Sequence, residues 1–555
     1  MRSRTPSLRF TSFLIGAALV GPIACDGDST PTEAPRKSKL VDGPVELVGD
    51  GLSSCSHQPV EAGGSAARWC AFTHGHEAGK PAQLWVVNVA EARAGRAPCD
   101  GSSPNCLLLT TNLWTGEPTS SPAYPFVHRF YGDTLFFSTD ATNPPDAWDE
   151  TFTGTVQAWR PGMTQGRAVS GPNGFYCFGH ARAASAVCLS NQVKTSGVLT
   201  FDLLAGPVGD GMTGALPKIE TVKPYEADGT AVWSAGFSPT GAYFAFTTNA
   251  PLEAPVRGPV PIARRFRIVP SKELGATPPV EILRDLDKWV FTPDETHVAF
   301  LRDVKTSEVG VKTGTLTVAD FPSGANVRAV LPGVDKFAIF GETGKPALSV
   351  GVYQNTVKSL STFSIMRDLD HPEALVPVAN MVSDVSLSPD LKFSFFRAAA
   401  GGTITQTIVA RNDGTGVCQL NQNIGQSAFS VAFMPALGRI LWAEVGPGEA
   451  GTEGPIEGWY ANPDGCRNPR KFSENLAYFR PTHAGLVVGE VTADPSHMAV
   501  SYLPVRGDGF DWEAAVAITE RAGFTSLLLD DKDYLYTLDP GSSAEPGLYL
   551  HGPLR

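Results

Sequence analysis

Carboxylates, which are suited to binding chemistry, concentrate in the segments 139–155, 445–457 and 504–513, and the first and last of these segments also carry a tryptophan. The candidate partner-binding residues in them are Trp148, Asp149, Glu150, Asp508, Asp511 and Trp512. Exposed aromatic rings on loops held by a rigid scaffold are suited to contacting a protein or a glycan. The alternative interpretation is a set of solvated loops whose tryptophans fold back onto the scaffold.

The same carboxylates offer oxygen ligands to a hard cation such as calcium. Neither the run 508–513 nor the run 146–150 completes a calcium-loop pattern, so we expect no cofactor and no metal site, and calcium stays a minor alternative. The chain lacks the G-x-S-x-G, G-x-x-x-x-G-K and H-E-x-x-H motifs. We therefore assign no catalytic residue.

One phrase recurs along the chain and must position these segments. It reads FSPTGAYFAF at 237–246, and related phrases stand at 291–300, 387–396, 433–442 and, more loosely, 492–501. Proline fixes the backbone angle of the first central position of a type I or II turn, so each phrase predicts two antiparallel strands joined by a tight turn. The prolines of the first four phrases are 54, 96 and 46 residues apart. Because 96 is twice 48, a weaker copy is expected between them, and 337–350 has the same strand–turn–strand pattern without the proline.

A mostly stranded repeat of roughly 40 to 60 residues is typical of β-propeller blades. We expect an all-β fold, a single β-propeller over 44–555 with eight four-stranded blades, and seven or nine as alternatives. The ends 45–49 and 547–554 should pair and close the ring, because an open ring leaves unpaired sheet edges. The long insertions 139–155, 248–265, 445–457 and 504–513 are expected to follow second strands and to share one face.

The repeated phrase resembles the repeats of the periplasmic translocation protein TolB and of the propeller domains of prolyl oligopeptidase-type peptidases. This resemblance covers most of 122–503 and implies the fold rather than an activity. TolB also has an α/β domain ahead of its propeller, and the peptidases have a hydrolase domain. We expect neither addition in this chain, because there is no room for an α/β domain between Cys25 and the first blade and because the G-x-S-x-G motif of a hydrolase domain is missing.

The N-terminus predicts where in the cell the protein is located. Residues 1–24 hold three arginines and then an apolar run, which is the layout of an export signal, and Cys25 follows directly. This resembles a bacterial lipoprotein signal, which implies that Cys25 is lipidated. An ordinary cleaved secretion signal is the alternative. Residues 25–43 read as a flexible polar tether.

The other eight cysteines are an even number, which suits disulfides in an oxidising compartment. The expected pairs are Cys55–Cys70, Cys99–Cys106, Cys177–Cys188 and Cys418–Cys466. Both members of the last pair follow an Asp-Gly turn in successive repeats, so this disulfide should join neighbouring blades.

The formal net charge of −12 argues against nucleic acid or anionic lipid headgroups as partners. We expect a non-enzymatic, lipid-anchored propeller of the bacterial cell envelope, on the periplasmic side or the cell surface. It should be a monomer that binds an envelope protein or a glycan and contacts the membrane only through its anchor. One alternative is a propeller-type hydrolase or lyase acting at the channel mouth, and another is a structural scaffold for an envelope protein.

Overall fold

The structure is a computed structural model, and the part of the chain that it describes is interrupted at many loops. The described residues are 45–49, 55–57, 69–74, 81–94, 96–97, 99–113, 128–143, 153–180, 182–195, 198–222, 225–227, 230–232, 234–249, 264–306, 312–347, 349–357, 360–388, 390–400, 403–413, 415–420, 429–446, 454–482, 484–493, 498–522, 526–529, 533–538 and 547–551. The predicted signal segment 1–24, Cys25 and the predicted tether 25–43 lie outside these residues.

Antiparallel strands make up almost all of the fold, and most of them fall into groups of four that follow one another along the chain. The first groups are β2 (Cys55–His57), β3 (Trp69–His74), β4 (Ala82–Asn88) and β5 (Cys106–Leu113); β6 (His128–Tyr131), β7 (Thr134–Asn143), β8 (Thr153–Trp159) and β9 (Arg167–Ala168); and β10 (Gly174–His180), β11 (Ala183–Thr195), β12 (Val198–Pro207) and β13 (Lys218–Val222). A two-stranded hairpin, β14 (Tyr225–Ala227) and β15 (Thr230–Val232), comes next.

The middle of the chain contains two long strands that each serve two groups. These groups are β16 (Ala235–Phe237), β17 (Tyr243–Asn249), β18 (Arg264–Pro270) and β19 (Val280–Arg284); β20 (Leu286–Phe291), β21 (His297–Thr306), β22 (Lys312–Asp320) and β23 (Arg328–Phe340); β23 again with β24 (Ser349–Val357), β25 (Leu360–Met366) and β26 (Val376–Leu387); and β26 again with β27 (Phe393–Ala400), β28 (Thr403–Arg411) and β29 (Val417–Gln419). The outer end of β23 pairs with β22 and its inner end with β24, and β26 divides in the same way between β25 and β27.

The remaining groups are β30 (Phe429–Met434), β31 (Arg439–Val445), β32 (Ile456–Asn462) and β33 (Arg467–Ser473); β34 (Leu476–Pro481), β35 (Gly485–Val491), β36 (Met498–Arg506) and β38 (Val516–Ala522), with β37 (Gly509–Phe510) on the end of β36; and β39 (Ser526–Leu529), β40 (Asp533–Leu538), β41 (Gly547–His551) and β1 (Val45–Gly49). The helices are α1 (Val89–Arg93), capped by Asn88, and the single turns η1 (Ser271–Glu273) and η2 (Pro372–Ala374). No helix in the described ranges is long and apolar enough to cross a bilayer.

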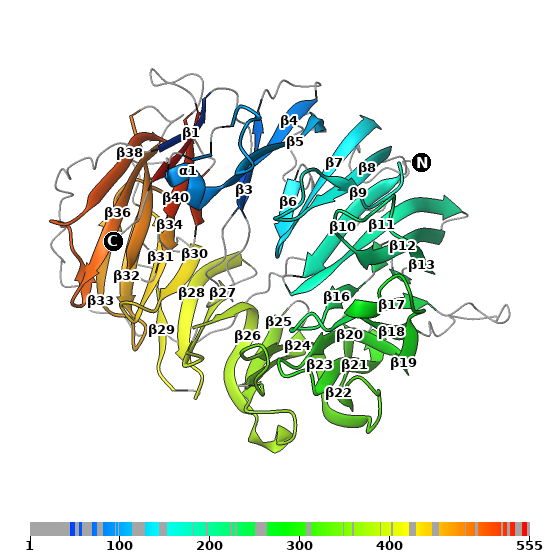
Figure 1. The fold of residues 1–555 in the computed structure, drawn as a ribbon. Helices are drawn as coiled ribbons and strands as arrows, with labels where there is room; N and C mark the ends of the chain where they lie inside the picture. Colours follow the sequence, from blue (N-terminus) through cyan, green and yellow to red (C-terminus); the bar gives the residue numbers. More distant parts are fainter. Residues whose placement is uncertain are drawn as a thin grey trace, which may run out of the picture.

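The groups stand side by side around a common centre, which is the arrangement of a β-propeller (Figure 1). The pairing of β1 with β41 adds a group that joins both ends of the chain, and this is the contact expected between 45–49 and 547–554. The number of eight blades stays a prediction, because the groups are defined here by hydrogen bonds and not by their places around an axis.

The repeated phrase forms the turn between the first two strands of a group. The residue before its proline accepts a hydrogen bond through its side-chain oxygen from the backbone N–H five residues later; these residues are Ser238, Thr292 and Ser388, with distances of 3.1, 3.0 and 3.0 Å. The residue two after the proline has positive φ, namely Gly241 at 76°, Glu295 at 56° and Leu391 at 57°. A type II turn would need positive φ one residue earlier, so these are type I turns followed by a left-handed residue.

The core lies between successive groups rather than inside any one of them. Val187 of β11 and Phe244 of β17 share one buried cluster, and Phe266 of β18 and Phe300 of β21 share the next. Each fully buried aromatic side chain contributes about 1.5–3 kcal/mol relative to leaving it exposed. The alternating apolar residues of each strand therefore stabilise the stacking of one group against its neighbours, and this stacking holds the inner strands in place.

One expectation about the insertions is wrong. The segments 139–155, 248–265 and 445–457 do connect second strands to third strands, as predicted. The segment 504–513 instead follows β36, which is the third strand of its group because β34 and β35 precede it. Antiparallel strands alternate in direction, so this segment leaves from the opposite end of its group. The tryptophan-bearing segments 139–155 and 504–513 therefore do not share one face.

Candidate functional site

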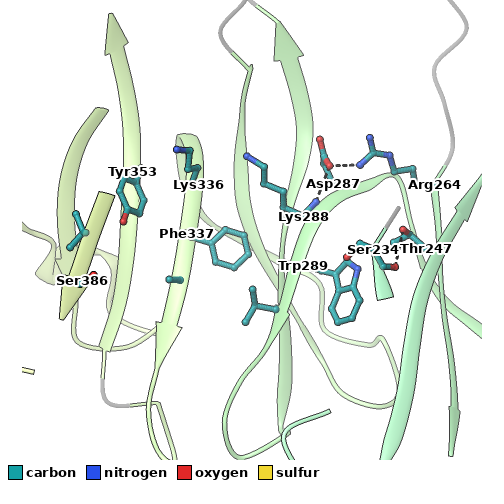
Figure 2. Close-up of a pocket in the computed structure, with 13 residues that line it drawn as sticks. Ser234, Thr247, Arg264, Asp287, Lys288, Trp289, Lys336, Phe337, Tyr353 and Ser386 are labelled. Carbon is teal, nitrogen blue, oxygen red and sulfur yellow. Dashed lines mark hydrogen bonds and ion pairs between the residues drawn. The ribbon is translucent and has the colours of Figure 1, made fainter. Parts of the chain in front are cut away.

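A cavity of about 620 Å³ lies against the first strands of four successive groups. The lining residues are Ser234, Thr247, Arg264, Asp287, Lys288, Trp289, Val290, Lys336, Phe337, Ala338, Tyr353, Val385 and Ser386. They come from β17, β18, β20, β23, β24 and β26 and from the residue just before β16, so the cavity exists only because these groups stack side by side (Figure 2). Its volume lies within the range of pockets that bind small molecules or short chains.

β-Bulges interrupt three of the strands that line the cavity, β20, β23 and β26. The register shifts between Asp287 and Trp289 in β20, between Val334 and Lys336 in β23, and between Val382 and Val385 in β26. A bulge adds a residue to one strand and re-aims the side chains around it. Lys288, the extra residue of β20, has a φ of 34°. At these bulges the regular alternation of side chains between the two faces of the strand is interrupted. The charged residues Lys288 and Asp335 lie at two of these interruptions.

Cationic side chains dominate the polar end of the cavity, although the whole chain is acidic. Three of the four charged lining residues are cations, namely Arg264, Lys288 and Lys336. Arg264 forms an ion pair with Asp287, the fourth of them. Lys288 Nζ donates a hydrogen bond of 2.8 Å to the carbonyl oxygen of Asp335 and lies 3.8 Å from its carboxylate. The cavity therefore favours a ligand that brings negative charge.

Aromatic rings line the other part of the cavity. Figure 2 shows the rings of Trp289 and Phe337 below the Lys288 and Lys336 head groups, with Tyr353 to one side. Lys336 Nζ lies 5.8 Å from the centre of the Tyr353 ring, within cation–π range. Trp289 is held edge-on by Phe266, with ring centres 4.8 Å apart.

The indole N–H of Trp289 is a buried donor, and it has no hydrogen-bond partner among the described residues. Leaving a buried donor unsatisfied costs about 1–3 kcal/mol.

The sequence contains a signal for this site that our reading of the carboxylate-rich loops missed. Asp287-Lys288-Trp289 and Asp335-Lys336-Phe337 repeat the tripeptide Asp-Lys-aromatic at the inner strands of successive groups. Strand propensity explains the aromatic residue, but it does not explain a pair of charged residues on a strand near the centre of the propeller. The sequence does not reveal the bulge, which decides the direction of these side chains.

The residues predicted to bind a partner are not brought together by the described structure. Trp148, Asp149 and Glu150 lie outside the described residues. Asp511 caps the backbone N–H groups of Glu513 and Ala514 at 3.2 Å each and pairs with Arg506 at 3.4 Å.

Asp508 is exposed and lies 3.9 Å from Arg439 and 3.8 Å from Arg470. Trp512 is half-buried against Phe510, with ring centres 6.5 Å apart, and packs on the core between β30–β33 and β34–β36. The geometry of Trp512 is the folded-back alternative that the sequence left open.

Three of the four expected disulfides are present: Cys99–Cys106, Cys177–Cys188 and Cys418–Cys466. The last joins β29 to the turn between β32 and β33, so it links neighbouring groups as predicted. Cys55 and Cys70 lie on the paired strands β2 and β3, where Cys55 is opposite Phe72 and Cys70 opposite His57. The pairing of these two cysteines stays a prediction.

Across the described ranges, His, Cys, Asp and Glu side chains form no group of three or more that could hold a metal ion. The calcium alternative at 508–513 therefore gains no support from geometry, and 146–150 lies outside the described residues. The cavity instead offers ammonium, guanidinium, hydroxyl and indole donors, which are partners for an anion rather than for a cation.

Comparison with known proteins gives structural likeness only. No protein-family model matches the chain, and no curated protein matches it. Among solved structures, a eukaryotic initiation factor is similar at 11% identity and a TM-score of 0.41, over 81% of this chain and 98% of that one. The β-propeller domain of the trilobed protease from Pyrococcus furiosus is similar at 10% identity and a TM-score of 0.32, over 62% and 96%. A putative TolB from Agrobacterium tumefaciens is similar at 12% identity and a TM-score of 0.25, over 46% and 84%.

Proposed function

We propose that this chain is a non-enzymatic binding protein of the bacterial cell envelope, and that the cavity on its inner strands is the ligand site. The observation that carries the proposal is the lining of this cavity, in which three cations and three aromatic rings converge from separate strand groups. A pocket with an apolar wall and a few convergent polar groups is the usual form of a binding site. The ligand is an anion with an apolar ring or face.

The cavity, rather than the acidic loops, is the better supported site for two reasons. Most of its residues lie on hydrogen-bonded strands, and the contact between Lys288 and Asp335 joins two of the bulges, so their positions are maintained before a ligand arrives. Its lining also includes Thr247 of β17 and Arg264 of β18, the two strands that the insertion 248–265 connects.

The envelope address rests on the N-terminal signal and Cys25 together with the disulfides, which form in oxidising compartments. Lipidation of Cys25 would tether the propeller to a membrane through residues 25–43. Incorporation of radiolabelled palmitate into the full chain, and its absence in the Cys25→Ser variant, would support this anchor. A wild-type chain that takes up no label would refute it.

Binding at the cavity can be tested with an anionic aromatic dye, anilinonaphthalene sulfonate, and its neutral relative phenylnaphthylamine. We expect the sulfonate to bind the full chain, and Lys336→Ala to weaken this binding by about tenfold, the loss of one charge-assisted contact. The matched control is Lys345→Ala, which removes an exposed lysine on the turn after β23. Equal binding of the sulfonate to all three proteins would rule out the cavity as the site.

A further inference from the structure

We propose that the ligand of the cavity is an acidic carbohydrate, a short chain of sugars that carry carboxylate or sulfate groups. This inference rests on the proposed function and narrows its ligand class. Two features of the described residues support it: the bulged edges of the inner strands, and the lysine head groups that lie above aromatic rings in the cavity lining.

The bulges disfavour an extended peptide as the occupant. A peptide that adds to an inner strand depends on a continuous row of backbone hydrogen bonds along a free edge. β20 is the first strand of its sheet, but the register breaks at Lys288, inside the cavity. β23 and β26 carry breaks of the same kind beside it. Recognition in this cavity must therefore come from side chains.

The position of the lysines above aromatic rings matches the two faces of an acidic sugar. Figure 2 shows the Lys288 and Lys336 head groups above the rings of Trp289 and Phe337, with the Tyr353 ring beside Lys336. A pyranose ring has an apolar C–H face that packs on an aromatic ring, and its acid group projects from the edge of the ring. The Lys288–Asp335 contact fixes the position of one ammonium group before binding.

A hydroxyl group adds to the match. Sugar hydroxyls both donate and accept, and the Ser386 hydroxyl in the cavity lining can do the same.

Isothermal titration calorimetry of the full chain can test the inference with five probes: a trimer of hexuronic acid, a neutral hexose trimer, a sulfated hexose trimer, a glutamate-rich peptide and a fatty acid. We expect at least one acidic trimer to bind, and the neutral trimer to bind at least about tenfold more weakly, because one charge-assisted contact contributes this much. The better of the two acidic trimers then identifies the acid group. Binding of the acidic trimer should weaken as sodium chloride is raised from 0.05 to about 0.5 M, since salt screens the lysines.

Two variants make the site assignment specific. Lys336→Ala should weaken binding of the acidic trimer by about tenfold. Trp289→Phe keeps an aromatic ring but offers a smaller face to the sugar, and should weaken binding by about threefold, the effect of losing a small area of apolar contact. Lys345→Ala should bind as the wild type does, and equal melting temperatures would show that all three variants are folded.

Several outcomes would overturn the inference. Equal binding of neutral and acidic trimers would do so, as would Lys336-dependent binding of the glutamate-rich peptide or the fatty acid in place of a sugar. If the sulfonate dye binds with the expected dependence on Lys336 and no sugar binds, the ligand class is wrong and the proposed function stands. If the dye shows no dependence on Lys336, the proposed function itself fails.

Discussion

Lys288 and Asp335 are the extra residues of β-bulges in two neighbouring inner strands, and they contact each other. The Lys288 ammonium donates a hydrogen bond of 2.8 Å to the Asp335 carbonyl oxygen, and its Nζ lies 3.8 Å from the Asp335 carboxylate. Each bulge interrupts its own ladder, and the contact between them joins β20 to β23 where the ladders are interrupted. The cavity is therefore a structured part of the ring and not a gap between sheets.

A stabilising link between repeats is predicted at Glu295. Its carboxylate accepts hydrogen bonds from both the backbone N–H and the hydroxyl of Thr240, which lies in the equivalent turn of the preceding group. Glu295→Ala should lower the free energy of unfolding by about 1–3 kcal/mol, because two hydrogen bonds to a charged acceptor are lost. Urea unfolding would measure this change. Glu342→Ala, which removes an exposed carboxylate paired with Lys345, should change stability by less than about 0.5 kcal/mol.

The stabilisation that each disulfide gives is predicted to increase with the length of the loop that it closes. Cys418 and Cys466 are 48 residues apart, whereas Cys99 and Cys106 are 7 apart. In the chain-entropy model, replacing the first pair by alanines should cost about 4 kcal/mol and replacing the second about 2 kcal/mol. Urea unfolding of the two double variants tests the order, and a larger loss for the 99–106 pair would contradict it. Mass spectrometry under non-reducing conditions would also test the fourth pair, Cys55–Cys70.

The two residues of a buried ion pair between β32 and β33 are predicted to differ in how much their removal destabilises the protein. Lys471 Nζ lies 2.8 Å from Glu457 Oε1, and the Glu457 side chain is 8% exposed. Lys471→Met should cost about 3–5 kcal/mol, because it leaves a buried carboxylate without its cation. Glu457→Gln should cost less, since the Trp459 indole N–H, now 3.1 Å from the carboxylate, can still donate to the amide oxygen. Thermal unfolding would compare the two variants, and a greater loss in Glu457→Gln would contradict this account.

A pH dependence is predicted at Glu490 in β35. Burial raises the pKa of this carboxyl above its ordinary value of 4.5, although the Ser473 hydroxyl donates a hydrogen bond of 2.6 Å to it. Well below pH 4.5 the group is protonated in both states and has no effect. As the pH rises above 4.5 the unfolded chain ionises first, so the contribution of Glu490 to stability falls until the pH passes the folded-state pKa.

The Glu490→Gln variant lacks this titration. Its stability relative to the wild type should therefore increase between pH 4 and neutral pH, as measured by urea unfolding at several pH values. A difference between the two proteins that does not change with pH, or that decreases as the pH rises, would show that Glu490 ionises in the folded state as easily as in the unfolded one.

Sequence pattern predicted the repeat well because local chemistry determines it. The proline, the preceding serine or threonine and the left-handed residue of each turn act within six residues of one another, as Ser238, Gly241 and Tyr243 show. The pairing of Cys418 with Cys466 was also predictable, because both cysteines occupy equivalent places in successive repeats. The prediction for 504–513 was wrong because this segment follows the third strand of its group and not the second. One additional strand before the segment reverses the end of the group from which it leaves.

The candidate site was harder to predict because it depends on register. A single extra residue in β20 decides whether Lys288 follows the alternation of its strand, and no propensity marks that residue. Trp512 illustrates the opposite error: its position in an acidic loop suggested exposure, but its ring packs onto the core beside Phe510. Distances along the sequence could not show which residues of separate groups would meet.

Hydrogen–deuterium exchange of the full chain, with and without saturating anilinonaphthalene sulfonate, tests the central claim most directly. The account predicts slower exchange in peptides that cover 286–291 and 334–340, and unchanged exchange in β31 (439–445), which lies away from the cavity. The Lys336→Ala variant should lose this protection at the same dye concentration. Protection confined to 504–513, or spread evenly over the strands, would contradict the assignment of the ligand site to the inner-strand cavity.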